Sequence, residues 1–348
     1  MGNSCAKGPP RDVDEPGDPS RPGFRDRRLS VSQLPVSSSP GGRRMSVYNE
    51  DAEPPAQVAN TEITLPAVSV KSVAGIEPVP GGATRKINQD RALTVYPFKG
   101  DKDVALMGCF DGHGKLGELT SQFVIDNLPQ VLAGQPAYPD DVPSALMKAF
   151  VQVDNALGQN VDASVSGTTA VAAVMRGDKM WVANAGDSRA IIARRGPGGA
   201  LRAHDLTQDQ KPDTPLEKAR IEKMGGRVSP AAADGTPARV WHNFRGLAMA
   251  RSIGDHNAKA VGVIAEPEVT TYTVHKDDAL LILASDGVWE FLTSQDVCDI
   301  AHSMAGSNNS AICDRIVFKA AERWEEEEGD YRDDITAVVI SFPWMPAQ

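Results

Sequence analysis

The chain has 348 residues, of which 41% are hydrophobic and 24% charged, enough to bury one substantial core. Its formal net charge of -10 argues against a surface built to bind the phosphate backbone of nucleic acid. No apolar run approaches the roughly 20 residues that a membrane-spanning helix needs. The 4 cysteines show no metal-ligand spacing and follow no signal peptide, so a reducing, cytoplasmic location is expected.

The first 66 residues are dense in Pro, Gly, Ser, Arg and Asp and lack apolar periodicity, which is typical of a disordered tail. Its start, M-G-N-S-C, offers Gly2 for myristoylation and Cys5 for palmitoylation. Ala6, however, stands where the acylation pattern favours Ser or Thr. Two lipids would hold part of the protein at the cytoplasmic face of a membrane.

Two basic sequences in the tail resemble sites of cyclic-nucleotide-dependent, basophilic kinases. They are R-R-L-S, ending at Ser30, and R-R-M-S, ending at Ser46. Phosphorylation would add about -1.5 to -2 charge beside the arginines and weaken attraction to anionic lipid. The alternative, a merely basic disordered patch, accounts for the same residues equally well.

Apolar runs that predict strands recur after the tail. They are A-L-T-V-Y-P-F, V-A-L-M-G-C-F, T-A-V-A-A-V-M, K-M-W-V-A-N-A, R-A-I-I-A-R-R, A-L-L-I-L-A-S and I-T-A-V-V-I-S-F. Short turns join most of them, as R-G-D-K does between Met175 and Met180. Such hairpins predict largely antiparallel sheets.

Helical periodicity lies between these runs, at residues 116–132, 141–157, 215–224, 294–304 and 310–328. The third helix should begin with Thr214 as N-cap, Pro215 at N1 and Glu217 at N3, and stop at a Gly-Gly pair. This mixture of strands and helices predicts an α+β fold. We expect one domain over residues 67–348, behind a tail of residues 1–66.

Four aspartates stand at ends of the predicted strands: Asp90 in N-Q-D-R, Asp111 in F-D-G-H-G, Asp286 in A-S-D-G and Asp333 in R-D-D-I. A carboxylate at the mouth of a buried strand is costly unless its charge is compensated. Divalent cations that prefer oxygen ligands are the usual compensation. The pattern therefore predicts a metal site.

Taken in order, nine motifs resemble those of the metal-dependent Ser/Thr protein phosphatases of type 2C, and those of plant and protist members most. The motifs are K-I-N-Q-D-R, C-F-D-G-H-G, S-G-T-T-A, V-A-N-A-G-D-S-R-A, L-T-Q-D-Q-K-P-D, G-L-A-M-A-R-S-I-G-D, E-P-E-V-T, L-A-S-D-G-V-W-E and R-D-D-I-T-A-V-V. The match runs from about Arg85 to Phe342. The resemblance implies a four-layer α-β-β-α sandwich, in which helix pairs flank two antiparallel sheets.

The resemblance also implies a centre with two Mg²⁺ or Mn²⁺ ions at one edge of the sandwich. Asp111 would bridge both ions, the Gly112 carbonyl would be a further ligand, and Asp286 and Asp333 would complete the first ion. The ions would activate a water for attack on phosphoserine or phosphothreonine, without a phosphoenzyme. Asp90 would be a metal-site residue that orients metal-bound waters.

Two more side chains gain a role from the resemblance. His113 would protonate the departing Ser or Thr oxygen as general acid, and Arg85 would bind the phosphoryl oxygens with its fork of donors. Phosphorylated proteins are therefore the expected substrates. Residues 211–246 would form a flap that shapes substrate choice, and we expect the protein to act as a monomer.

The chain departs from the family pattern at Gln89, where many members have Glu. An amide removes one negative charge, so the second ion should bind more weakly. Asp187 and Glu290 match positions that in relatives hold a looser third ion. Asp187 could instead simply turn a hairpin.

Two rival functions have some support in the sequence. Gly112, Gly114 and Gly117 spell G-x-G-x-x-G after a strand, the fingerprint of a dinucleotide site. That site also needs a second parallel strand ending in an acid about 20 residues on, where this sequence is still helical. The other rival is a catalytically weak, phosphoprotein-binding relative, and only Gln89 supports this alternative.

Overall fold

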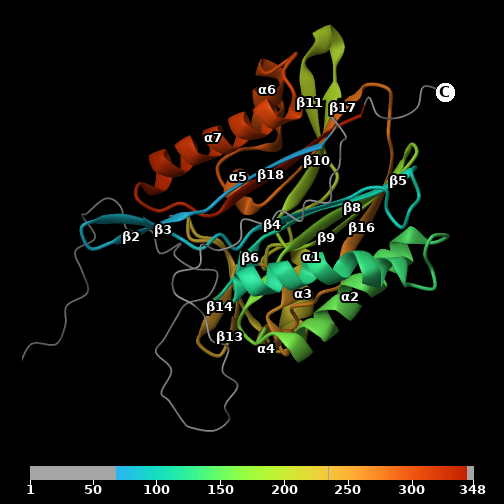
Figure 1. Cartoon of the computed structure of the whole chain (residues 1–348). Coiled ribbons are helices and arrows are strands. Elements are labelled where there is room, and N and C mark those ends of the chain that lie inside the picture. The colour runs from blue at the N-terminus through green and yellow to red at the C-terminus, as the bar shows by residue number, and fades with distance from the viewer. Residues whose placement is uncertain (1–67, 234, 343–348) are drawn as a thin grey trace, which may run out of the picture.

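Two antiparallel sheets stacked face to face form the centre of the molecule, and a pair of helices covers each outer surface (Figure 1). The computed structural model describes residues 68–233 and 235–342. The predicted four-layer α-β-β-α fold is confirmed. The predicted tail, with Gly2, Cys5, Ser30 and Ser46, lies outside the described residues. Within the described part, no helix is long and apolar enough to cross a membrane.

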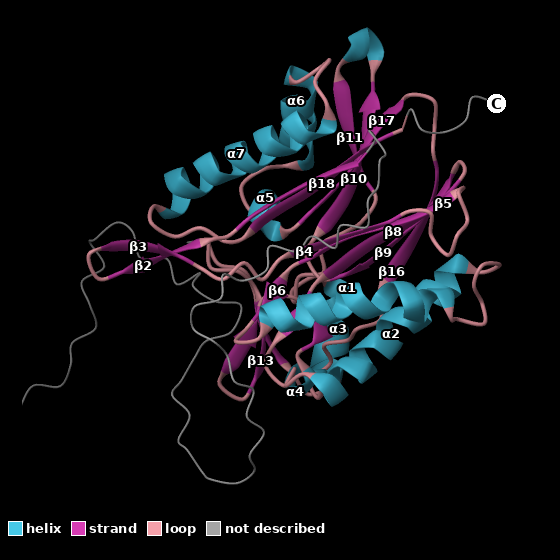
Figure 2. Ribbon diagram, in the orientation of Figure 1, coloured by secondary structure: helices cyan, strands magenta, loops and turns pink. Residues whose placement is uncertain are grey.

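The first sheet has the strand order β16-β9-β8-β5-β4. Its strands are β4 (Arg91–Val95), β5 (Val104–Phe110), β8 (Ala170–Arg176), β9 (Lys179–Ala185) and β16 (Glu268–Thr273). Helices α1 (Gly117–Ala133) and α2 (Val142–Asn160) cover it (Figure 2). The predicted turn between β8 and β9 is present, with Gly177 at φ 56°. Glycine favours this positive φ, as a tight hairpin requires.

The second sheet has the order β1-β18-β17-β10-β11. Its strands are β1 (Val68–Val73), β10 (Arg189–Arg195), β11 (Leu201–Asp205), β17 (Asp278–Ala284) and β18 (Ile335–Ser341). Helices α6 (Ser294–Ser303) and α7 (Asn309–Glu328) cover it, and a short 3-10 turn, Pro197–Gly199, links β10 to β11.

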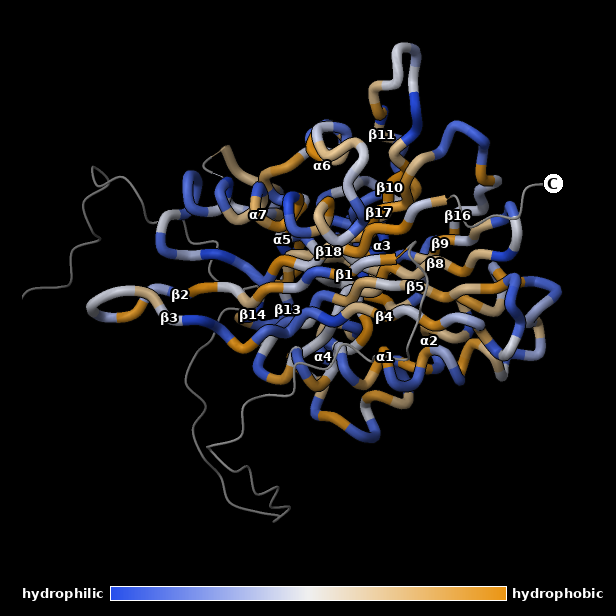
Figure 3. The backbone as a smooth tube through the Cα atoms, turned by 45° about the horizontal axis from the view of Figure 1, so that its top comes forward, coloured by the Kyte–Doolittle hydropathy of each residue, from blue (hydrophilic) through white to orange (hydrophobic). Residues whose placement is uncertain are grey.

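The central strands are apolar throughout because both of their faces are buried. In β5, Leu106 and Phe110 point to the core under α1 and α2, whereas Met107 and Cys109 point to the core between the sheets. This alternation follows from the period of two in a strand. Hydrophobic colour accordingly runs along the strands of both sheets in Figure 3.

The five predicted helices are present, and none of their bounds is shifted by more than three residues. Asp141 caps α2 by accepting from the Ser144 amide, and a capping box starts α6. The third helix, α3 (Pro215–Lys223), differs from prediction at its start. Thr214 forms no side-chain cap, and its hydroxyl donates to the Lys211 carbonyl instead.

Small elements surround the edge of the sandwich at which the aspartates lie. They are β2 (Ile76–Val79), β3 (Gly82–Arg85), β6 (Gly112–His113), β7 (Gly167–Thr168), β12 (Arg227–Ser229), β13 (Arg239–His242), β14 (Arg245–Leu247), β15 (Ile253–Gly254), α4 (His256–Lys259) and α5 (Asp286–Trp289). Strands β12, β13 and β14 form a three-stranded sheet that, with α3, spans the predicted flap. A separate small core containing Ile221, Val240 and Leu247 holds this unit together.

Candidate metal centre

Antiparallel pairing brings the four predicted aspartates to one edge of the sandwich. Arg91 of β4 pairs with Phe110 of β5, so Asp90 before β4 lies near Asp111 after β5. In the other sheet β17 pairs with β18. Asp286 follows the end of β17 and Asp333 precedes the start of β18, so they also share an end. The two sheets therefore offer two carboxylates each at the same edge.

Asp187 joins this group from the link between β9 and β10, which carries the chain from one sheet to the other. Its side chain is buried, and its charge contributes to raising the pKa of Asp286. Glu290 lies one helical turn after Asp286, at the end of α5, and is exposed. The structure thus places Asp187 in the cluster and Glu290 at its rim.

The carboxylates repel one another strongly. Burial, followed by repulsion from Asp286 and Asp90, raises the pKa of Asp111 well above its usual range. Burial and the charges of Asp187 and Asp333 do the same to the pKa of Asp286. Burial, and then the nearby Asp334, raises the pKa of Asp90 to about 7. Such a cluster favours cations.

Two lysines already enter the cluster. The Lys86 Nζ lies 2.6 Å from Asp333 Oδ1, and the Lys211 Nζ lies 2.5 Å from Asp187 Oδ2. Burial alone would lower the pKa of each lysine, but the facing carboxylates outweigh it and raise both pKa values. Burial would likewise raise the pKa of Asp333, but the charge of Lys86 outweighs burial and lowers this pKa.

The residues of the cluster fit a divalent cation. Asp90, Asp187 and Asp286 each keep one buried carboxylate oxygen that has no hydrogen-bond partner in the described chain. A buried unpaired carboxylate oxygen is expensive, and a cation would satisfy it. Among the described residues no three His, Cys, Asp or Glu side chains stand close enough together to form a metal-binding group by themselves. The assignment therefore rests on the unpaired carboxylate oxygens, and Mg²⁺ usually takes only one or two carboxylates directly beside its waters.

Asp90 and the neighbouring Asp334 tie the two sheets together beneath this cluster. Ser285 donates its hydroxyl to Asp90 Oδ2 at 2.7 Å, so Asp90 is held from the opposite sheet. Asp334 accepts the Gly75 amide at 2.6 Å and the Gln89 amide at 2.7 Å. The sequence did not single out Asp334, whose role is to fix the turn that presents Asp90.

Gly112 lies where only glycine fits. A Cβ there would stand 2.4 Å from the carbonyl oxygens of both Gln89 and Gly117, closer than any contact allows. The Gln89 side chain donates its amide to the Gly114 carbonyl and to Glu118 Oε2, both at 2.9 Å. These glycines therefore serve close packing. Strand β5 is antiparallel to both of its neighbours, which rules out the parallel βαβ unit of a dinucleotide site.

His113 is paired with a residue that sequence reasoning missed. Its Nε2 lies 2.7 Å from Asp255 Oδ2, and both side chains are buried. Ser252 donates its hydroxyl to the same Asp255 oxygen at 2.7 Å. Burial lowers the pKa of His113, but Asp255 outweighs this and raises it. The pairing with Asp255 therefore favours the protonated form of His113.

Arg85 is not drawn into the cluster. It ends β3, is exposed, and among the described residues forms no ion pair with the aspartates. Its chain neighbour Lys86 makes that contact instead. Arg85 is therefore at the rim, where an incoming anion could meet it.

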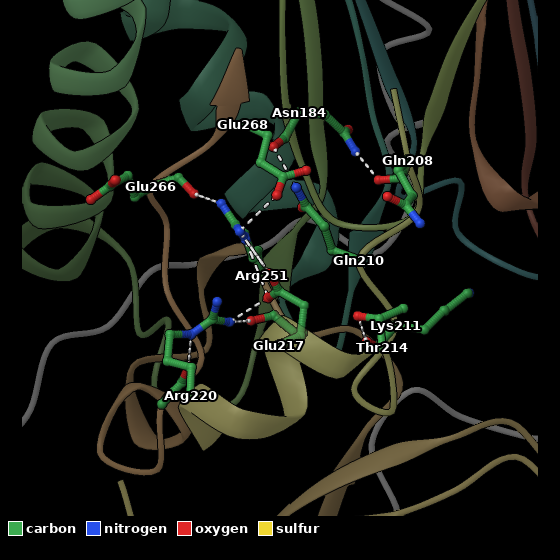
Figure 4. Close-up of polar contacts among 12 residues, drawn as sticks. Asn184, Gln208, Gln210, Lys211, Thr214, Glu217, Arg220, Arg251, Glu266 and Glu268 are labelled. Atoms are coloured by element: carbon green, nitrogen blue, oxygen red, sulfur yellow. Dashed lines mark hydrogen bonds and ion pairs between the residues drawn. The ribbon is translucent and has the colours of Figure 1, made fainter. Parts of the chain in front are cut away.

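The flap helix α3 is fastened to the body by a buried carboxylate (Figure 4). The Glu217 carboxylate accepts hydrogen bonds from the guanidinium groups of Arg220 and Arg251. Arg251 also forms an ion pair with Glu268 on β16, at 3.1 Å. Burial would raise the pKa of Glu217, but the two arginines hold it below its usual range. Glu217, which the sequence predicts at position N3 of this helix, thus also anchors the helix to the body.

Backbone contacts place the lysine at the start of the flap. Gln210 accepts the Gly186 amide at 2.8 Å through its side chain, and its carbonyl accepts the Ala250 amide at 2.7 Å. Because Gln210 is fixed twice, the next residue, Lys211, is directed at Asp187.

A cavity of about 330 Å³ lies between the flap and the loop before β7. Its lining includes Asp255, the partner of His113, together with Val165, Val240, Leu247 and Phe244. Phe244, at the turn between β13 and β14, is 81% exposed. The cavity therefore joins the His113 side of the centre to an apolar surface of the flap.

Comparison with known proteins identifies the group to which these features belong. A family model described as protein phosphatase 2C matches residues 82–328. The probable protein phosphatase 2C 72 of Arabidopsis thaliana is 35% identical over 293 residues, which cover 79% of this chain and 86% of that protein. The probable protein phosphatase 2C 64 of Oryza sativa subsp. japonica is 38% identical over 268 residues, covering 74% and 62%.

A solved structure supports the fold independently. The serine-threonine phosphatase 2C from Toxoplasma gondii superposes with a TM-score of 0.69 over 80% of this chain and 96% of its own, at 24% identity. At that identity the likeness concerns the fold, and it agrees with the four layers seen here.

Proposed function

The chain belongs to the protein phosphatase 2C family and is a metal-dependent protein serine/threonine phosphatase, and from this premise we propose which of its residues bind the metal ions and which act on the substrate. Asp111, Asp286, Asp333 and the Gly112 carbonyl would hold two Mg²⁺ or Mn²⁺ ions, and Asp90 would orient the waters of these ions. The observation that carries this proposal is the group of mutually repelling carboxylates with unpaired buried oxygens. When bound, the ions supply a water of lowered pKa and neutralise phosphoryl charge.

The remaining steps belong to the protein's side chains. His113, kept protonated by Asp255, gives its proton to the departing Ser or Thr oxygen. Arg85, exposed at the rim, binds the phosphoryl oxygens as the substrate enters. Asp187 and Glu290 would hold a third, looser ion only if the Lys211 ammonium moves away from Asp187.

Hydrolysis of a phosphoserine peptide by the full-length protein tests this proposal. Activity should require added Mn²⁺ or Mg²⁺ and vanish in excess EDTA. Peptide binding without turnover at any metal concentration would favour the rival reading of a catalytically weak, phosphoprotein-binding relative.

We propose that the flap, about residues 211–246, selects substrates through the cavity beside Asp255, which would receive an apolar side chain flanking the phosphoresidue. Phe244→Ser should lower kcat/KM about tenfold for a peptide with Leu next to phosphoserine, the scale of one apolar contact. A Gly-flanked peptide and p-nitrophenyl phosphate should be unaffected. Phe318→Ser is the matched control, since Phe318 is 51% exposed on α7, at the opposite outer layer. Equal effects on both peptides would remove this role.

We further propose that the tail decides location, through acylated Gly2 and Cys5 and a kinase acting on Ser30 and Ser46, and that the catalytic domain acts as a monomer. A single myristoyl chain binds membranes with K of only about 10⁴ M⁻¹, so attachment should need both lipids. Gly2→Ala should release the protein to the soluble fraction, Cys5→Ser partly so, with phosphatase activity per molecule unchanged. Cell fractionation with a myristate analogue measures this. A wild-type protein that is already soluble and unlabelled would show that Ala6 defeats acylation.

A further inference from the structure

Lys86 is an ammonium group built into the acidic centre. Its Nζ lies 2.6 Å from Asp333 Oδ1 and 5.2 Å from the centre of the Tyr331 ring, and its side chain is 20% exposed. Gly75 leaves the space for this path, because a Cβ at Gly75 would come within 2.5 Å of Lys86 Cε. The fold thus accommodates a lysine at this point, whose charge the Asp333 carboxylate and the aromatic face both favour.

The Asp333 oxygen that Lys86 contacts is fully engaged. Asp333 Oδ1 also accepts the Asp334 backbone amide at 2.9 Å. The other oxygen, Oδ2, lies 3.5 Å from the Tyr331 hydroxyl, too far for a strong hydrogen bond. A cation that approached Asp333 would therefore compete with Lys86 at Oδ1, or bind Oδ2 against the repulsion of a nearby ammonium.

The charges around the centre determine how strongly this competition affects metal binding. Six aspartates surround the centre, namely Asp90, Asp111, Asp187, Asp286, Asp333 and Asp334, and two lysines, Lys86 and Lys211, enter it. Each lysine already compensates one carboxylate, Asp333 or Asp187. Without Lys86 the charge of Asp333 would be left uncompensated, so removal of Lys86 should favour cation binding.

We propose that Lys86 is a built-in competitor of the divalent cation for Asp333, holding that carboxylate in the metal-free protein and weakening metal binding. The inference rests on the proposed role of Asp333 as a ligand. The competition makes the occupancy of the metal site responsive to metal concentration. The Lys86–Asp333 pair also lets the acidic edge stay folded when no ion is bound.

Lys86→Met tests this without substrate. In calorimetric titration of the full-length protein with Mn²⁺ alone, the variant should bind at least about tenfold more tightly than wild type, because one nearby charge changes an ionic equilibrium by a factor of ten or more. In EDTA its melting temperature should fall by a few degrees, since Asp333 is left unpaired. Lys86→Arg keeps the charge and should bind Mn²⁺ as weakly as wild type.

The matched control is Lys71→Met, which breaks an exposed ion pair with Asp314 and should change neither quantity. Equal Mn²⁺ affinity of Lys86→Met and wild type would overturn the inference. Lys86→Arg that binds Mn²⁺ as tightly as Lys86→Met would also overturn it. Phosphopeptide hydrolysis by wild type is measured separately. Hydrolysis that depends on Mn²⁺ alongside unchanged affinity in Lys86→Met would therefore refute the competitor and leave the proposed function standing.

Gln89→Glu is a second arm with a different signature. It adds a negative charge and should also tighten Mn²⁺ binding. It removes the amide that serves Gly114 and Glu118, however, and sets a carboxylate against Glu118. Its metal-free melting temperature should therefore fall too, but addition of Mn²⁺ should recover most of the loss. If its titration superimposes on that of wild type, added charge at this edge does not govern affinity, which contradicts the charge argument for Lys86.

Discussion

Asp286→Asn is expected to reduce metal-dependent phosphopeptide hydrolysis by more than about a hundredfold while the protein stays folded. The exchange keeps the shape of the side chain but removes a charged ligand, and even residues that only support metal ligands typically cost 10–100-fold (about 1–3 kcal/mol). Asp111→Asn should behave alike, because Asp111 and Asp286 each lie in the centre of the repelling group. Initial rates across a Mn²⁺ series measure the effect.

Stability separates this effect from unfolding. Because burial and neighbouring carboxylates raise the pKa of Asp286, its charge costs free energy in the metal-free protein at neutral pH. Asp286→Asn should therefore melt in EDTA at the same temperature as wild type or higher, and Mn²⁺ should stabilise it less. Asp314→Asn is the control, since Asp314 is an exposed partner of Lys71. Near-normal rates in both active-site variants would refute the metal centre assigned here.

His113→Gln is expected to separate substrates by their leaving groups. Hydrolysis of a phosphoserine peptide should fall by about 10²–10⁴, the usual contribution of a general acid, because a Ser alkoxide cannot leave without a proton. p-Nitrophenyl phosphate should be affected far less, since p-nitrophenolate is a stable anion. Asp255→Asn keeps the imidazole but removes the carboxylate 2.7 Å away, so it should show the same selectivity, more weakly.

Comparing kcat for the two substrates in each variant measures this difference. His302→Gln, on the exposed end of α6, is the control. If His113→Gln slows both substrates equally, His113 organises the metal centre or the binding of phosphate, and proton donation is not its role.

The sequence by itself determined the elements and the residues at their ends. Seven predicted strands and five helices are present because their signals are local: a period of two or continuous apolar runs, a period of 3.6, caps and turns. Strands β1, β11 and β16 are not among the predicted strands, since each lies at a sheet edge and carries few buried side chains. Carboxylates at strand ends were equally visible, because burial makes them costly wherever the chain folds.

Tertiary structure alone decided which of these residues meet. Lys86 and Asp333 stand 247 positions apart, and His113 and Asp255 stand 142 apart. No periodicity reports such pairs, because they depend on how two sheets stack and where each strand ends. Glu217 shows the same limit: its spacing predicted only its N3 position at the start of a helix, and the fold buries it between two arginines. Local patterns fix what a segment becomes, and long-range packing fixes which charges must neutralise each other.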